Sequence, residues 1–394
     1  MDTATRDADR GLTADVRDAT SAPKRTPGVV WWAAIGAVFF AAEVYVLGKW
    51  VTGPYFKRVP TGPSDPPTWM KAELVLSQII SVGLALWLLY WFLYRPWRRE
   101  KRITTDGLLV AACFLMAWQD PFCSYFNNWF TYNSWLPNFG SWAMAVPGWV
   151  SPQKPGAMIA EPIFITFWTY AWLWFGIAMI GCAMMRKAKS QWTRLTDPRL
   201  VALLFVFMIL VDFIAEGVLF LPLGWFVYPG GHTPALFPDA YHKWPWHEGL
   251  LAAAWFTGLT CLRYFKNDKG QTVVERGVDT LRVSQRRKDL LRFFGLVGIT
   301  NVIALASYNI PQAVMSARSG PWPKDVQSRS YFLDGLCGVG TDTACPAPGV
   351  PLPRGADSAR LSPDGKLVVP PGTELPEPVP LRSGKAGPFN GGPF

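Results

Sequence analysis

Charged residues are scarce in this chain of 394 residues. Only 17% are Asp, Glu, Lys or Arg, whereas 50% are hydrophobic and 21 are Trp. This composition is too apolar for an ordinary soluble domain and is typical of a membrane protein. The net charge of +10 does not indicate a nucleic-acid partner, because the basic residues lie in short loops between apolar segments, where they set the orientation of a membrane protein.

The sequence also lacks the motifs of common nucleotide-dependent and serine-nucleophile enzymes. It has no Gly-rich phosphate loop, no G-x-S-x-G, no H-E-x-x-H and no G-x-G-x-x-G ahead of a strand. The function classes that remain are acid–base chemistry without a cofactor, and transport.

Long apolar segments predict an all-α fold, a bundle of about seven transmembrane helices with an aromatic interfacial loop. Each run is long enough to cross a bilayer. The runs cover residues 29–47, 69–94, 108–118 with its flanks, 162–185, 200–223, 246–262 and 290–310.

Basic residues alternate between the connections of these runs. Residues 95–102, 186–199 and 263–288 are rich in Lys and Arg, and the other connections are poor in them. Basic loops stay in the cytoplasm. We therefore expect an integral protein of the cytoplasmic membrane, with its N-terminus inside and its C-terminus outside.

The chain is expected to have three parts. Residues 1–27 are polar and predict a disordered cytoplasmic tail, residues 28–315 form the membrane domain, and residues 316–394 form a Pro/Gly-rich extracytoplasmic tail. Cys337 and Cys345 on the predicted outer side either form a local disulfide or stay as two free thiols.

Carboxylates lie in or beside the apolar runs, toward their outer ends. A charge at this depth costs roughly 3 kcal/mol or more, so such residues are usually functional. We therefore predict one acidic cavity shared by several helices near the outer surface. Its predicted carboxylates are Glu43, Glu73, Asp120, Glu161, Asp212, Glu216 and Glu248.

Asp212 and Glu216 are the strongest candidates for catalysis. Their i, i+4 spacing places both on one helix face. Two carboxylates so close do not ionise together easily, so one can act as a general acid and the other as a general base. Asp120, Glu161 and Glu248 would support this pair. The alternative is structural, with the pair bound to loop cations such as Lys243 or Lys154.

The connection from about residue 120 to 161 is long and aromatic. We expect part of it to be an interfacial helix, and the whole to be a lid over the cavity. The alternative is a simple aromatic belt at the membrane surface. The residues predicted to contact substrate are Tyr125, Asn128, Trp129, Tyr132, Asn133 and Trp142, with Glu43 and Glu73 in the cavity wall.

All three His residues lie in one connection. His232, His242 and His247, with Asp212 or Glu216, could together offer metal ligands, but their spacing matches no metal motif, so no metal is predicted. His247 is a candidate proton-transfer partner of the carboxylates, and plain loop or cap roles are the alternative.

Four motifs resemble the AveC-like spirocyclase family of actinobacterial membrane proteins. They are the segment W-Q-D-P…Y-F-N-N-W…P-N-F-G-S-W at 118–142, A-E-P at 160–162, D-F-I-A-E at 212–216 and E-G at 248–249. The resemblance covers about residues 28–315. It implies spiroketal formation from a dihydroxy-ketone late in polyketide assembly, in some members with dehydration, and no cofactor. It assigns no catalytic residue to this chain.

The predicted partners are a hydrophobic small-molecule substrate and membrane lipid, without nucleic acid and with an undetermined oligomeric state. One rival function is a terpenoid or lipid cyclase or isomerase. A second is a proton-coupled carrier or lipid-binding protein, and a third is a structural subunit. A carrier would normally need polar groups in both halves of the bundle and often internal repeats, and neither is visible in the sequence.

Overall fold

A computed structural model describes residues 26–150, 159–232, 234–318, 320, 322–333, 336–337, 344, 360–362, 364–369 and 371. Most of the two expected tails lies outside these residues. Cys337 is disulfide-bonded, whereas Cys345 and Lys154 fall outside the described part.

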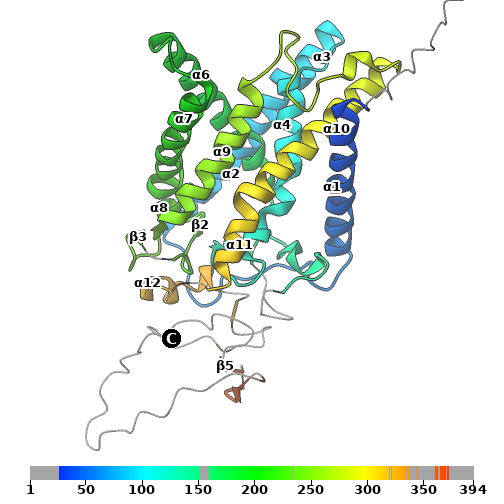
Figure 1. Cartoon of the computed structure of the whole chain (residues 1–394). Coiled ribbons are helices and arrows are strands. Elements are labelled where there is room, and N and C mark those ends of the chain that lie inside the picture. The colour runs from blue at the N-terminus through cyan, green and yellow to red at the C-terminus, as the bar shows by residue number, and fades with distance from the viewer. Residues whose placement is uncertain are drawn as a thin grey trace, which may run out of the picture.

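The described residues form a helical bundle, which confirms the prediction of an all-α membrane protein (Figure 1). Within the described part of the chain, six helices are long and apolar enough to cross a membrane, by length and composition. They are Gly28–Val51, Thr68–Glu100, Thr105–Ser124, Thr166–Gln191, Asp197–Leu223 and Gln285–Ser316.

The remaining expected span, residues 246–262, forms helix α9 (Trp246–Tyr264) but is not among those six. Its polar residues include His247, Glu248 and Arg263, which lower its apolar character. The helix lies inside the bundle and packs against α6, α7 and α10. A helix surrounded by protein does not need an apolar surface on every side.

Four of the six spans contain a π-helical segment, written η. They are α2 (Thr68–Leu88) with η1 (Leu89–Tyr94) and α3 (Arg95–Glu100); α5 (Thr166–Thr169) with η4 (Tyr170–Trp174) and α6 (Phe175–Gln191); α7 (Asp197–Asp212) with η5 (Phe213–Phe220) and α8 (Leu221–Leu223); and α10 (Gln285–Ala304) with η7 (Leu305–Asn309) and α11 (Ile310–Ser316). The other two are α1 (Gly28–Val51), and α4 (Thr105–Met116) with the 3₁₀ segment η2 (Ala117–Ser124). Short π-helical segments are frequent at functional sites.

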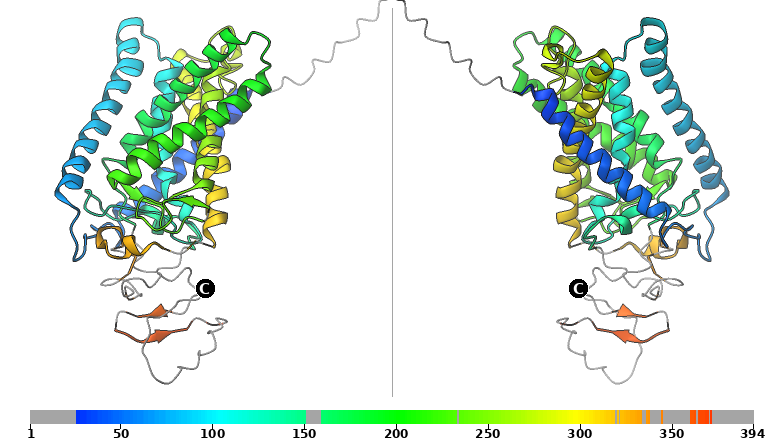
Figure 2. Two further views of the ribbon diagram at one scale, coloured as in Figure 1. Left: turned by 90° about the vertical axis from the view of Figure 1, so that its left-hand side faces the viewer. Right: turned by 90° about the vertical axis from the view of Figure 1, so that its right-hand side faces the viewer.

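Helices α1 and α10 pack closely where two glycines meet. A Cβ atom on Gly36 would lie 1.8 Å from the backbone oxygen of Phe294, and one on Gly298 would lie 2.6 Å from the backbone oxygen of Trp32. Small residues let membrane helices approach in this way. Figure 2 shows α1 running obliquely along one side of the bundle.

Short elements close the end of the bundle opposite the α3 helix. Strand β1 (Thr131–Tyr132) pairs antiparallel with β2 (Phe226–Val227), and β3 (Ala235–Leu236) pairs with β4 (Trp244–Pro245). The interfacial helix expected in the third connection is limited, within the described residues, to the end of η2 and to η3 (Trp142–Ala145). The other described short elements are η6 (Val278–Thr280), α12 (Lys324–Gln327), η8 (Ser330–Phe332), β5 (Arg360–Leu361) and β6 (Leu367–Val368).

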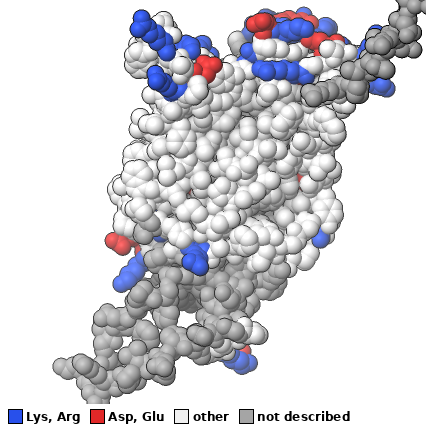
Figure 3. Space-filling model, viewed as in Figure 1, with Lys and Arg blue, Asp and Glu red and all other residues white. Residues whose placement is uncertain are grey.

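Charges separate along the bundle. Lys and Arg gather at the end that carries α3, and the side of the molecule in this view is almost free of charge (Figure 3). We call the end that carries α3 the basic end; it is formed by residues 95–106, 186–199 and 263–292. The opposite end of the bundle is called the cavity end. Thr104 caps α4 at the basic end by accepting a hydrogen bond of 3.1 Å from the backbone N–H of Gly107. The orientation of the two ends in the membrane stays a prediction.

Candidate functional site

A cavity lies at the cavity end, among η2, β1, η4, η5, α9 and η7. It contains about 690 Å³ of space not filled by protein atoms, its opening included. The polar residues that line it are Asp120, Cys123, Tyr132, Thr166, Thr169, Tyr170, Glu216, Tyr228, Glu248 and Tyr308. The aromatic rings that line it, apart from these tyrosines, are Phe130, Trp174, Phe220, Trp225, Phe226, Trp255 and Phe256.

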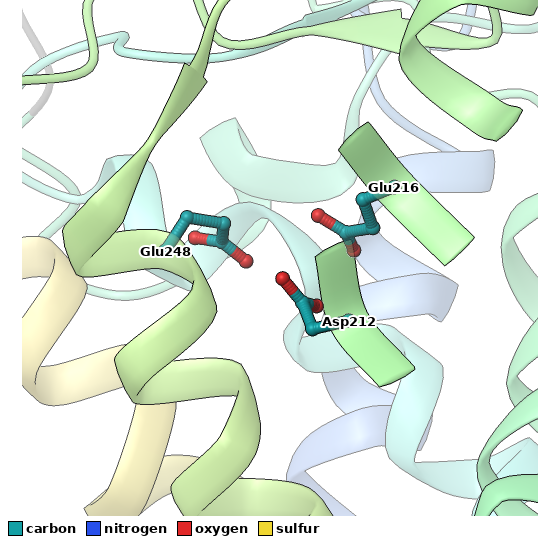
Figure 4. A group of neighbouring side chains, drawn as sticks. All are labelled: Asp212, Glu216 and Glu248. Carbon is teal, nitrogen blue, oxygen red and sulfur yellow. The ribbon is translucent and has the colours of Figure 1, made fainter. Parts of the chain in front are cut away.

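Three carboxylates meet beside this cavity. Asp212 ends α7, Glu216 lies in η5, and Glu248 lies in the first turn of α9. One oxygen of each lies within 4.8 Å of one oxygen of the others, and all three side chains are buried. Figure 4 shows the three carboxylates pointing toward one another from the two helices. We call this group the acidic triad.

Phenols and amides hold the acidic triad in place. The Tyr228 hydroxyl donates to Glu216 Oε2 at 2.6 Å and lies 3.4 Å from Glu248 Oε1. Tyr308 donates to Glu248 Oε1 at 2.8 Å, and the Gln312 amide donates to Glu248 Oε2.

Asp212 accepts a hydrogen bond of 3.2 Å from the Trp244 indole, and its Oδ1 has no hydrogen-bond partner among the described residues. None of the ion pairs between described residues includes a member of the acidic triad. Lys243, a candidate partner in the structural alternative, donates to the backbone oxygens of Pro229 and Gly231.

A second acidic centre lies at the same cavity, where Asp120 is among the lining residues and Glu161 is not among the described ones. Asp120 in η2 accepts hydrogen bonds of 2.9 Å from Tyr132 and 2.8 Å from Tyr170. Glu161 is fully buried and accepts a hydrogen bond of 3.1 Å from Ser141. Burial, together with the negative charge of Asp120, raises the pKa of Glu161 well above its usual value.

Strand pairing positions two of the phenols. Thr131 pairs with Val227 and Tyr132 with Phe226, so the third and fifth connections lie side by side. Tyr228 follows directly after β2 and stacks on Trp129, with centroids 4.7 Å apart and an interplanar angle of 5°. The pairing therefore brings the phenols of Tyr132 and Tyr228 to one cavity from separate parts of the chain.

Several residues predicted to contact substrate do not lie in the described wall of the cavity. Tyr125 donates a hydrogen bond to the backbone oxygen of Gly148, and Asn133 donates one to that of Gly224. Trp142 donates to the backbone oxygen of Trp118 and is fully buried. None of Tyr125, Asn133 and Trp142 is among the described residues that line the cavity.

Of the other residues predicted to contact substrate, Tyr132 lines the cavity, whereas Asn128 and Trp129 are not among its described lining residues. Trp129 supports Tyr228, and Asn128 is buried. His247 faces the rings of Trp129 and His232, with centroids 5.5 and 5.6 Å away.

Two predicted wall carboxylates are also outside the described lining. Glu43 is buried in α1, with Oε2 lacking a hydrogen-bond partner among the described residues. Glu73 accepts a hydrogen bond of 2.9 Å from Trp225, whose ring lines the cavity.

No catalytic or substrate-binding role is predicted from the sequence for four residues that bind the carboxylates: Tyr170, Tyr228, Tyr308 and Gln312. Tyr170 lies within an apolar run and Tyr308 lies near the end of the last one, which is a weak sign of a buried hydroxyl. Tyr228 follows a run, where a tyrosine resembles an interfacial anchor. Gln312 lies just beyond the last predicted run.

The acidic triad is also close enough to hold a metal ion. Carboxylate oxygens suit hard divalent cations. No metal was predicted from the sequence.

Comparisons with known proteins identify the family. The model of the family described as "Spirocyclase AveC-like" matches residues 100–332, which include both acidic centres. No curated protein and no solved structure matches the chain. The chain therefore belongs to the AveC-like spirocyclase family.

Proposed function

We propose that this protein is a membrane-embedded acid–base spirocyclase that closes a spiroketal on a hydrophobic, polyketide-like or lipid substrate. Family membership implies spirocyclase-type function. The observation that supports the chemistry is a buried triad of carboxylates beside a cavity with aromatic walls.

The acidic triad can supply both the acid and the base. Three buried carboxylates within 4.8 Å of one another repel if all are ionised, so at least one retains a proton. That proton is given to the hydroxyl of a cyclic hemiketal, which leaves as water and produces an oxocarbenium ion. A second substrate hydroxyl attacks this carbon, and its proton passes to an ionised carboxylate of the triad.

We assign the acid–base steps to Asp212 and Glu216, with Glu248 in support. Glu216 and Glu248 line the cavity, whereas Asp212 lies behind them within reach of both. A proton can therefore move from Asp212 to the lining carboxylates after each turnover. We assign no proton-transfer step to His247, because its ring faces Trp129 and His232.

The cavity walls suit a greasy substrate and a cationic intermediate. Trp174 and Trp255 pack edge to face with ring centroids 4.9 Å apart, and the ring centroid of Tyr308 lies 5.0 Å from that of Trp255. Aromatic faces stabilise a nearby positive charge and hold a flexible chain in a folded pose.

Asp120 and Glu161 would support the site, and Asp120 would act through the two tyrosines that bind it. Tyr132 and Tyr170 each donate a hydrogen bond to Asp120. A phenol oxygen that donates its hydrogen can also accept a hydrogen bond, so Tyr170 can accept one from a substrate hydroxyl.

The test is the metabolite formed by the native producing strain with substitutions in the chromosomal gene. Asp212→Asn and Glu216→Gln should each cause a precursor to accumulate that is heavier than the wild-type product by one water. Asp197→Asn, at an exposed carboxylate of the basic end, is the control and should leave the product unchanged. Full product formation by both triad variants would refute the assignment, and a precursor without a ketone and two hydroxyls would favour a different cyclase.

A further inference from the structure

A second hollow lies at the basic end and shares no residue with the cavity. It is bounded by the end of the second span (residues 91–102), the start of α4 (103–106) and the connection from 266 to 292. It contains about 1840 Å³ of space not filled by protein atoms, open solvent included. We call it the basic groove.

The basic groove has an excess of positive charge. Eight cationic side chains line it, against four carboxylates. Each carboxylate already has a cationic partner. The pairs are Glu100 with Arg102, Asp106 with Lys266, Asp279 with Lys269, and Asp289 with Arg292, at 2.7–3.1 Å.

Four of the eight cationic side chains that line the groove are not part of these pairs. Arg95, Arg99, Lys101 and Lys288 form no ion pair with a carboxylate among the described residues. Unneutralised cations that converge on one hollow attract an anion, and phosphate is the anion that Arg and Lys bind most readily.

The backbone turns sharply at one of these cations. Lys101 ends α3 with a φ of 53°, in the left-handed region that non-glycine residues seldom adopt, and its N–H bonds to the Trp97 carbonyl at 3.1 Å. This turn folds the chain back toward α4, so the cations before and after it face the same hollow.

The groove opens beside a surface suited to lipid. Arg95 places its guanidinium over the Trp91 ring, 4.1 Å from the centroid. Tyr90, Tyr94 and Trp97 on the same segment are about half exposed, as in the aromatic belts at the level of lipid headgroups. Farther along the span, exposed apolar side chains such as Ile80, Leu84 and Trp87 continue this surface.

We propose that the basic groove binds the phosphate-bearing headgroup of an anionic membrane lipid. The unpaired cations hold the phosphate, and the acyl chains lie along the exposed apolar face of α2 and η1. A soluble anion would make no use of that face. Basic hollows between transmembrane helices are known to recognise such headgroups.

The experiment measures binding of phosphatidylglycerol to the purified full-length chain in neutral detergent. Phosphatidylcholine and glycerol 3-phosphate are the comparison ligands. The double variant Arg99→Gln/Lys101→Gln removes two unpaired cations of the groove. The double variant Arg186→Gln/Arg194→Gln removes the same charge from exposed positions of the basic end outside the groove lining.

We expect phosphatidylglycerol to raise the unfolding temperature, and phosphatidylcholine and glycerol 3-phosphate to have little effect. The groove variant should bind phosphatidylglycerol roughly 10- to 30-fold more weakly, and the control should bind as the wild type does. Arg99→Lys/Lys101→Arg keeps both charges and should restore binding.

Three results would overturn the proposal. Equal weakening in the groove variant and the control would indicate diffuse attraction rather than a site. Equal stabilisation by glycerol 3-phosphate would show that the acyl chains contribute nothing, and equal stabilisation by phosphatidylcholine would show that the unpaired cations do not select the ligand.

Discussion

The hydroxyl of Tyr228 donates a hydrogen bond of 2.6 Å to Oε2 of Glu216. Through this bond, a residue next to a two-residue strand fixes the orientation of a carboxylate in a membrane helix. It also links the third connection to the acidic triad, because Tyr228 stacks on Trp129.

Removing this hydroxyl should impair catalysis without unfolding the protein. In Tyr228→Phe the ring still stacks on Trp129, but Glu216 loses its hydrogen-bond donor. We expect spiroketal formation to fall by roughly 10- to 100-fold, at the lower end of the effects typical of groups that set acid–base catalysis. Product formation in membranes with equal amounts of protein measures this.

Tyr125→Phe is the matched control for that substitution. It removes a hydroxyl from the same aromatic connection, bonded to the backbone oxygen of Gly148 and outside the described cavity lining. Its activity should stay within about twofold of the wild type, since the triad is untouched. Equal losses in both variants would mean that the hydroxyls stabilise the connection rather than the carboxylate.

Glu161 should make the protein less stable as the pH rises. Its pKa in the folded protein is raised above the ordinary value of 4.5, so the folded state holds a proton that the unfolded chain releases above that pH. The free energy of unfolding therefore decreases progressively as the pH increases from about 4.5 through the folded-state pKa. Glu161→Gln should flatten the fall of the unfolding temperature between about pH 5 and pH 8.

The same thermal series on Glu100→Gln provides a comparison. Glu100 is exposed at the basic end and should change the pH dependence little. Parallel curves for the wild type and Glu161→Gln would show that Glu161 does not keep its proton in the folded protein.

The contact of α1 with α10 should not accept a methyl group. In Gly36→Ala the new Cβ would overlap the backbone oxygen of Phe294, so one helix must move. We expect a loss of roughly 1–3 kcal/mol or more in the free energy of unfolding. Denaturation in mixed micelles measures it.

Gly48→Ala in the same helix is the control, because a Cβ there meets nothing within 4 Å. It should be neutral or slightly stabilising, since Ala favours a helix over Gly. If both variants lose the same stability, the loss is not specific to the close approach of α1 and α10.

Removing both predicted catalytic carboxylates should cost little more than removing one. Residues that act as one unit give losses that do not add. The double variant Asp212→Asn/Glu216→Gln should therefore be about as inactive as the worse single variant. Losses that multiply would show that the two carboxylates act independently, despite lying within 4.8 Å.

The sequence was informative where the signal is local. Apolar length predicted about seven spans, of which six are long and apolar enough among the described residues and the seventh forms helix α9. The basic loops predicted which connections share an end. The spacing of Asp212 and Glu216 predicted their proximity, since residues four apart share a helix face even though η5 begins between them.

Long-range pairing was beyond sequence reasoning. The sequence around Tyr132 contains no signal that identifies Phe226 as its strand partner. Apolar periodicity also does not distinguish a π-helical segment from an α-helix, so the rotations at η4 and η7 that carry Tyr170 and Tyr308 could not be foreseen. Helix α9 tolerates polar residues because it lies in the centre of the bundle. That position depends on how its neighbouring helices pack around it.

The two-residue pairing of β1 with β2 has a consequence for biogenesis. Its strands are separated by two complete membrane crossings, so the phenols of Tyr132 and Tyr228 meet only after both crossings have been inserted. A chain arrested before the second of these crossings therefore holds Asp120 and Tyr132 but still lacks Glu216 and its donor Tyr228.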